Sequence, residues 1–364
     1  MSREIPTLVE PSHDLPIVHF TVVVREGSLR DPVGKDGLAR LTARLVRRST
    51  RERDARAVEE RIDSLGAELY VESGAGILRF SGVVIRRNLQ PLFELLGELL
   101  SQPRLGHDDF AQVKRETEAA IVEGWDSDSW LAATGFRRLL FRGHCYERSS
   151  LGTRASVASV TWEDASDFYS SYFTADRLLV GLAGDVDEAE ARRVVDAHLG
   201  GLSWGTGRDP VLAPEPSMPP GRRLRLVDKP DRSQTQIYIG RLGTHPADPD
   251  HHALMLGNLV FGGTFTARLM REVRSQRGWS YGASSRAAVG RVRDTWSMWT
   301  FPAAGDAAAC MALQIELMER WVSEGISQEE LDFARAYLTR SHAFTVDTAE
   351  KRLEKSIDAE LLQL

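Results

Sequence analysis

The chain has 364 residues, of which 42% are hydrophobic and 27% charged, and its formal net charge is −6. This length allows two domains with separate cores, and the acidic balance disfavours nucleic acid as the main partner. Cys145 and Cys310 are too few for a disulfide framework or a thiolate zinc site. No apolar run approaches the ~20 residues of a bilayer span, and the N-terminus lacks a signal-peptide pattern. We therefore expect a cytoplasmic protein without a membrane span, or a periplasmic protein if a leader has been removed.

The first half mixes strands and helices without a regular strand–helix alternation, which predicts an α+β fold. Segments rich in β-branched and apolar residues predict strands over residues 15–25, 68–71, 76–84 and 177–184. Apolar residues at helical spacing predict helices over residues 37–48, 53–65, 89–100, 108–124 continuing to about 140, and 186–199.

The second half repeats the order of the first. A strand at 235–240, turn residues and an apolar helix at 251–260 echo the first strand, turn and helix at an offset of roughly 215 residues. A last helix around 348–362 is followed by no strand like 177–184, so we expect this copy to be truncated or naturally abbreviated. Clustered Pro and Gly mark a linker between the copies. The predicted organisation is a domain at 1–202, a linker at 203–221 and a homologous domain at 222–364.

Several segments resemble, in the same order, the pitrilysin/insulinase peptidases of family M16. The resemblance is carried by GKDGLARLTARLVRRST (34–50), RETEAAIVE (115–123), GLAGDVDEAEA (181–191) and FGGTFTARLMREVRSQRGWSYGASS (261–285). It implies two homologous domains of the LuxS/MPP-like type, forming half of a clamshell chamber in which peptides are cut.

The family's zinc motif is an inverted H-x-x-E-H on the first helix. Residues four apart share a helix face, so two His can bind one metal beside a Glu that deprotonates the bound water. The matching positions here are Arg40, Ala43 and Arg44. Arginine has no lone pair for Zn²⁺, and alanine cannot act as a base. We therefore predict no metal and no cofactor in this chain, and we expect zinc in a partner subunit.

Two acidic residues downstream best match the family's third zinc ligand and helper carboxylate. They are Glu123 and Glu116, which lie seven residues apart and hence on one helix face. Three interpretations remain open: a vestige of the metal site, an ion pair in which Arg40 or Arg44 pairs with Glu123 in place of the metal charge, or ordinary solvated carboxylates.

The second half contains Arg274 and Tyr281 at the R-x6-Y spacing with which active family members hold substrate. The resemblance implies that Arg274 binds a peptide carbonyl and that Tyr281 donates its hydroxyl to a carbonyl oxygen or oxyanion. Gly278 would permit the intervening turn. The alternative is a surface arginine and a tyrosine buried by its ring.

A lost zinc motif with a retained Arg–Tyr pair matches the non-zinc subunit of bacterial heterodimeric M16B-type peptidases. The resemblance therefore implies a catalytically incomplete subunit, inactive alone, that supplies Arg274 and Tyr281 to the active site of a zinc-bearing partner. Unfolded or extended peptides are the expected substrates. Two alternatives remain: a structural homologue similar to the core subunits of the respiratory bc1 complex, or a homodimeric peptide-binding chamber.

Overall fold

The computed structural model describes residues 4–205, 213–218 and 220–362. Their helices and strands form two compact units, neither of which is continuous in sequence. Unit 1 contains Met1–Val122, Arg148–Leu212 and Thr345–Gln363, and unit 2 contains Glu123–Glu147 and Ala213–Phe344. The predicted α+β class is confirmed. The predicted domains follow chain order, whereas each compact unit also includes a helix from the other half of the chain, and part of the predicted linker lies outside the described residues.

Unit 1 is built on a five-stranded sheet in the order β1-β5-β2-β4-β3. Its strands are β1 (Thr7–Pro11), β2 (Ile17–Val24), β3 (Ala67–Ser73), β4 (Leu78–Ile85) and β5 (Leu178–Gly184). β5 pairs antiparallel with β2 and parallel with β1. Both faces of these central strands are covered, which explains why the continuous apolar run Val22–Val24 is fully buried.

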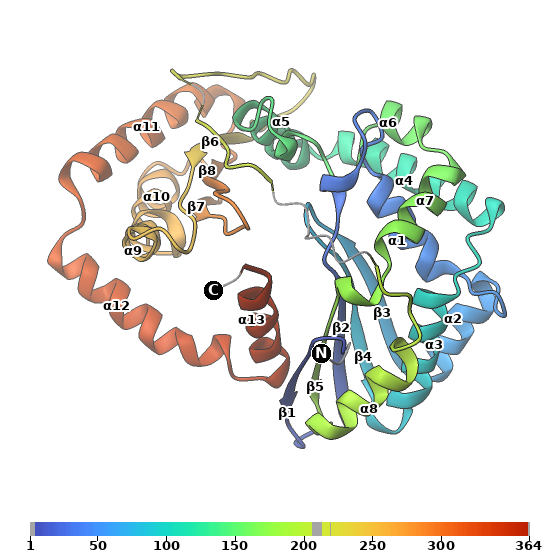
Figure 1. The fold of residues 1–364 in the computed structure, drawn as a ribbon. Coiled ribbons are helices and arrows are strands. Elements are labelled where there is room, and N and C mark those ends of the chain that lie inside the picture. Colours follow the sequence, from blue (N-terminus) through green and yellow to red (C-terminus); the bar gives the residue numbers. More distant parts are fainter. Residues whose placement is uncertain (1–3, 206–212, 219, 363–364) are drawn as a thin grey trace. The chain divides into compact units, whose positions relative to one another are not determined.

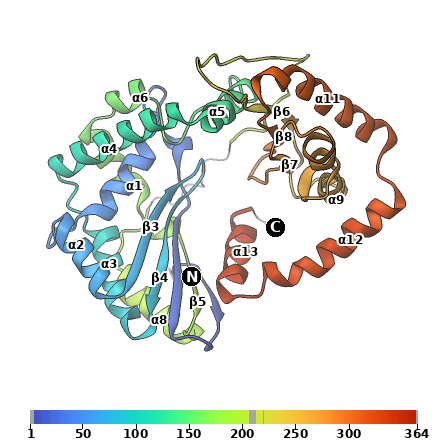
Figure 2. The same ribbon diagram turned by 180° about the vertical axis from the view of Figure 1, so that it is seen from behind.

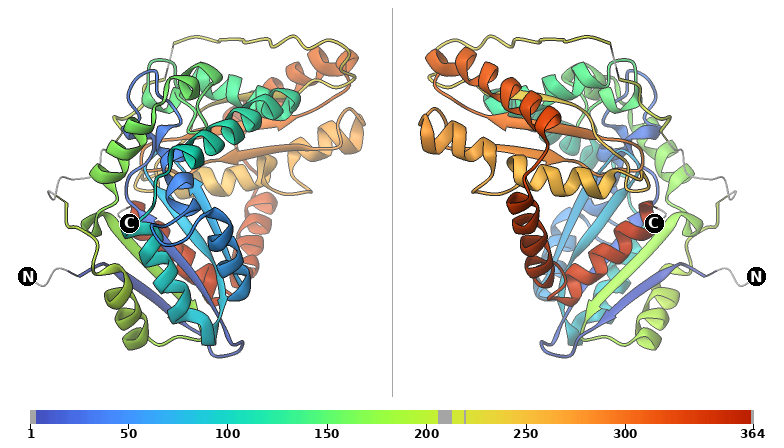
Figure 3. Two further views of the ribbon diagram at one scale, coloured as in Figure 1. Left: turned by 90° about the vertical axis from the view of Figure 1, so that its right-hand side faces the viewer. Right: turned by 90° about the vertical axis from the view of Figure 1, so that its left-hand side faces the viewer.

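The helices of unit 1 cover both faces of this sheet. They are α1 (Leu38–Arg48), α2 (Ala55–Ser64), α3 (Leu89–Ser101), α4 (His107–Asp126, of which residues 123–126 belong to unit 2), α6 (Arg154–Ser159), α7 (Trp162–Tyr172), α8 (Glu188–Leu199) and α13 (Ala349–Leu362). α1, α2 and α3 lie together beside one face (Figure 1 and Figure 2). α13, drawn in red in Figure 3, lies across β5 and β1 on the other face.

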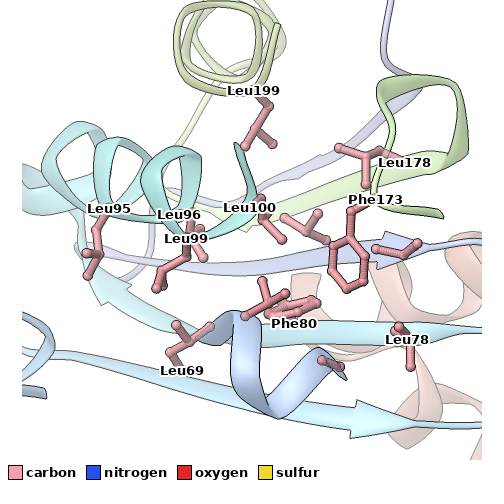
Figure 4. Close-up of a cluster of buried hydrophobic side chains, with 14 of the residues drawn as sticks. Leu69, Leu78, Phe80, Leu95, Leu96, Leu99, Leu100, Phe173, Leu178 and Leu199 are labelled. Atoms are coloured by element: carbon pink, nitrogen blue, oxygen red, sulfur yellow. The ribbon is translucent and has the colours of Figure 1, made fainter. Parts of the chain in front are cut away.

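Two apolar layers therefore sandwich the sheet of unit 1. On one side, leucines of α3 pack with Phe80 of β4, with Phe173, which directly follows α7, and with Leu199 at the end of α8 (Figure 4). On the other, Leu353 and Ile357 of α13 pack against β2 and β5. Gly181 of β5 makes this approach possible, because a Cβ there would lie 2.8 Å from Cδ1 of Ile357.

Unit 2 has a three-stranded antiparallel sheet within the described residues, in the order β6-β8-β7. Its elements are β6 (Ile237–Leu242), β7 (Ala283–Ala287), β8 (Thr295–Thr300), α5 (Asp128–Leu140), α9 (His251–Asn258), α10 (Arg268–Met270), α11 (Ala307–Glu324), α12 (Gln328–His342) and the π-helical segments Leu259–Gly263 and Arg271–Gln276. The ring of Phe261 stacks on Trp321 of α11 at 4.7 Å, and both contact Trp296 of β8. α5, which comes from the first half of the chain, packs against β6 by stacking Phe136 on Tyr238.

One helical stretch of unit 2, His251–Gln276, is long and apolar enough by composition to cross a membrane. Its side chains Phe261, Leu269 and Val273 are fully buried in the core of unit 2. A core helix passes the same test, so this stretch gives only weak support for a membrane span.

Candidate functional site

Three side chains of unit 2 form an exposed cluster, which we call the Arg274 cluster: Phe265, Arg274 and Tyr281. The guanidinium carbon of Arg274 lies 4.8 Å from the ring centres of both Phe265 and Tyr281, within cation–π range. Both rings remain open to solvent, with Phe265 69% and Tyr281 79% exposed. No carboxylate or carbonyl in the described residues pairs with Arg274, so its N–H donors remain available to a ligand.

The backbone around Gly278 fixes the spacing between Arg274 and Tyr281. Arg274 lies in the π-helical segment Arg271–Gln276, and Gly278, two residues beyond its end, has a left-handed φ of 65°. There the N–H of Gly278 donates to the carbonyl of Arg274 at 3.0 Å. The buried Ser280 hydroxyl then donates to the carbonyl of Gly282 at 2.8 Å and accepts from the N–H of Phe301. The predicted turn is confirmed. The hydrogen bonds of Gly278 and Ser280 hold the backbone immediately before Tyr281, and the bond to the Gly282 carbonyl holds it immediately after.

An ion pair anchors the helix that leads into the cluster. Arg268 of α10 donates two hydrogen bonds to the carboxylate of Glu330, at 2.7 and 2.5 Å, and a third to the carbonyl of Gly325. Glu330 also closes the capping box of α12 by accepting from the N–H of Ser327. The hydrogen bond from Arg268 leads the causes that lower the pKa of Glu330 to about 2, against burial, which opposes the shift.

This pair predicts an acid-sensitive contribution to the stability of unit 2. Because the folded-state pKa lies below the usual 4.5, the contribution is complete above about pH 4.5 and is lost as the pH falls towards 2. We expect Glu330→Gln to lower the free energy of unfolding by about 1 kcal/mol at pH 7, since both side chains are partly screened by solvent. Urea unfolding at pH 7 and pH 3 measures this, and an unchanged difference between wild type and variant at the two pH values would contradict it.

The zinc-motif positions lie on α1 in unit 1. The buried Asp31 carboxylate accepts from the N–H groups of Gly37 and Ala39, each at 2.8 Å, and so caps the start of the helix. Ala43 then faces the apolar core and is fully buried. Arg44, one residue on, points to α4 and donates to Glu116 at 2.8 Å.

Of the three interpretations left open, the structure shows an arginine–glutamate pair, but the carboxylate that pairs with Arg44 is Glu116 and not Glu123. Glu116 also pairs with Arg48 at 3.2 Å. Burial opposes its ionisation, but the hydrogen bond from Gln112 and the charges of Arg48 and Arg44 outweigh burial and lower the pKa of Glu116. Glu123 is exposed and makes no ion pair within the described part of the chain. Helical spacing put both glutamates on one face, but only Glu116 reaches the guanidinium of Arg44.

Arg40 differs from the other arginines of α1. It is partly buried, and it makes no hydrogen bond or ion pair to any described residue. No group of three or more His, Cys, Asp or Glu that could hold a metal ion occurs among the residues the structure describes. The donor set at Arg40, Ala43 and Arg44 does not fit a zinc ion, because two guanidinium cations occupy the positions of two ligands.

Sequence reasoning missed Phe265 and Arg48. Phe265 lies in the FGGTF segment, and nothing in its spacing from Arg274 predicts a ring contact. Arg48 follows Arg44 by one helical turn, so the i, i+4 rule could have identified it as a second partner for one carboxylate on α4.

The chain resembles known proteins along most of its length. Residues 7–153 match the insulinase family (peptidase family M16), and residues 159–338 match the peptidase M16 inactive domain. The Helicobacter pylori protein called non-peptidase homolog YmxG is 23% identical over 354 residues, covering 96% of this chain and 80% of that protein. An uncharacterized zinc protease of Mycobacterium bovis is 26% identical over 357 residues, covering 95% and 80%.

A solved structure shows the same fold. The peptidase M16 inactive domain from Pseudomonas fluorescens matches with a TM-score of 0.84 at 23% identity, covering 93% of this chain and 82% of that one. The fold and the two matched domains define a protein of the M16 peptidase architecture. The chain belongs to peptidase family M16. Since its relatives include both a named protease and a named non-peptidase homologue, membership alone does not decide activity.

Proposed function

We propose that this chain is a catalytically incomplete M16 subunit that holds extended peptides in the active site of a zinc-bearing partner. The observation that carries the proposal is the Arg274 cluster: an arginine without an acceptor among the described residues, between two exposed rings, seven residues before Tyr281. A guanidinium fork donates well to peptide carbonyls, and a tyrosine hydroxyl can donate to the oxyanion formed when a peptide bond is attacked.

The residues of α1 support placing the metal chemistry in another chain. Arg40 and Arg44 cannot ligate zinc, Ala43 cannot deprotonate a water, and Arg44 is already paired with Glu116. The partner would therefore supply the metal-bound water, and this chain would bind and orient the peptide. A shared active site of this kind requires a heterodimer, and it makes this chain inactive alone.

Peptide cleavage tests the proposal. A quenched fluorescent peptide library is incubated with this chain alone, with a zinc-bearing M16 homologue from the same organism alone, and with the mixture, each with and without a chelator. We expect strong chelator-sensitive cleavage only in the mixture. Cleavage by this chain alone would overturn the proposal, and a stable complex that gains no activity would favour a structural homologue.

Phe265 should tune peptide binding within this site. We expect Phe265→Ala to raise KM about 2- to 5-fold with kcat little changed, because an exposed cation–π contact contributes roughly 0.5–1 kcal/mol. Phe265→Tyr keeps an aromatic face and should restore KM, while Val322→Ala, at another exposed apolar residue of unit 2, should change nothing. Steady-state kinetics of the mixed complex measure both constants. An equal loss with Phe265→Tyr would show that the ring face does not act on Arg274.

A further inference from the structure

We propose that Arg40 binds a carboxylate of the peptide ligand, so that a position matching a zinc ligand of the family has become an anion site in this chain. The inference rests on the proposed function in that the ligand is a peptide, but the residues that carry it belong to unit 1 and not to the Arg274 cluster of unit 2. It starts from the charges along α1, where every arginine but one has a carboxylate partner in the described structure.

The ion pairs of α1 leave one positive charge uncompensated. Arg44 and Arg48 share Glu116, and Arg48 also pairs with Asp109 at 3.2 Å. Arg47 pairs with Glu59 of α2 and donates to the carbonyl of Leu69 at 3.0 Å. Arg40 has no such partner among the described residues.

Burial makes the missing partner of Arg40 costly. Its Nε is shielded from solvent and has no hydrogen-bond acceptor in the part of the chain that the structure describes. A buried donor left unpaired costs about 1–3 kcal/mol, and more when the group is charged. Burial first, and then the charge of Arg44, lower the pKa of the Arg40 guanidinium. It nevertheless stays protonated at neutral pH, because an arginine is effectively always charged in proteins. The two Nη groups of Arg40 are not among the shielded atoms, so a carboxylate can reach this end of the guanidinium and offset its uncompensated charge.

The excess charge indicates which anion fits. Arg40, Arg44 and Arg48 carry three positive charges against the two negative charges of Glu116 and Asp109, which leaves one. A single carboxylate balances this charge, whereas a phosphate dianion would overcompensate it. The planar guanidinium fork also matches a carboxylate in geometry. In an extended peptide the carboxylate comes from an Asp or Glu side chain or from the C-terminus.

Matched peptides test the assignment in the full-length chain. Four versions of one hexapeptide, with central Glu or Gln and a free or amidated C-terminus, are titrated by calorimetry. We expect the Glu or the free-C-terminus version to bind about 5- to 10-fold more tightly than its neutral counterpart. Arg40→Gln should abolish this preference and Arg40→Lys should keep part of it. Arg56→Gln is the matched control, because Arg56 is exposed and paired with Glu60, and it should keep the full preference. The carboxylate preference surviving in Arg40→Gln would overturn the proposal.

A second titration separates this site from the proposed clamp. Glutarate and inorganic phosphate are added while the Nε–Hε signal of Arg40, assigned from its loss in Arg40→Gln, is followed by NMR. A saturable shift with glutarate, larger than with phosphate, supports the carboxylate site even if no hexapeptide binds through unit 2. An unmoved signal with glutarate, or stronger binding of phosphate, overturns it. Melting curves of Arg40→Gln that match the wild type show that the variant is folded.

Discussion

Replacing Arg274 with alanine is expected to lower kcat/KM of the mixed complex about 10- to 100-fold, because a hydrogen bond from a charged donor to a peptide carbonyl contributes about 1.5–3 kcal/mol. The guanidinium lies over the Phe265 and Tyr281 rings and has no acceptor in the described residues, so its removal leaves no protein group unpaired. Folding and association with the partner should therefore be unchanged. Progress curves at low substrate concentration, with complex formation verified by size-exclusion chromatography, measure the effect.

Arg277→Ala provides the matched control. Arg277 follows Arg274 by three residues, but it donates to Glu272 at 2.8 Å and lies over the ring of Trp279. We expect its removal to change kcat/KM less than about 3-fold, as is usual for a partly exposed ion pair. Equal losses in the two variants would mean that general surface charge, and not the Arg274 cluster, drives the reaction.

Truncating both Leu353 and Ile357 to alanine is expected to destabilise unit 1 severely. These side chains are 2% and 0% exposed and fill the notch left by Gly181 on β5. Each buried truncation of this kind costs about 2–5 kcal/mol, against a typical total stability of 5–15 kcal/mol. We expect a lowered unfolding midpoint and faster hydrogen exchange in β1 and β5.

Glu354→Ala serves as the control on the exposed side of the same helix. It removes no buried contact, so it should leave the midpoint and the exchange of β5 unchanged within about 0.5 kcal/mol. If the double variant exchanged like Glu354→Ala, α13 would not stabilise the sheet of unit 1.

Local patterns predicted most of unit 1. The apolar spacing of α1 and α3 and the β-branched run of β2 are properties of short segments, so their predicted ranges agree with the structure to within a few residues. β1 was not predicted, because its pairing with β5, Thr7 opposite Val180, depends on residues far away in the chain. α13 was predicted as a helix, but the sequence of its apolar face does not indicate against which of the two sheets it packs.

Only those contacts of the site that follow from the spacing of residues along the sequence could be predicted. The R-x6-Y pattern and the Gly278 turn predicted that Arg274 and Tyr281 lie together. In the structure the guanidinium carbon of Arg274 lies 4.8 Å from the centre of the Tyr281 ring. Glu116 and Glu123 share a helix face, so periodicity could not choose between them as a partner for Arg44. That choice depends on which turn of α4 lies beside Arg44 in the packed unit, which is a property of the tertiary structure.

Titrating this chain into a fixed amount of zinc-bearing partner tests the shared active site most directly. We expect peptide cleavage to rise and saturate at one chain per partner. The double variant Arg274→Ala with Tyr281→Phe should bind the partner at the same ratio and give no rise. The same saturating rise with the double variant would contradict the proposal, because the chain would then activate its partner as a scaffold and not through the side chains it supplies.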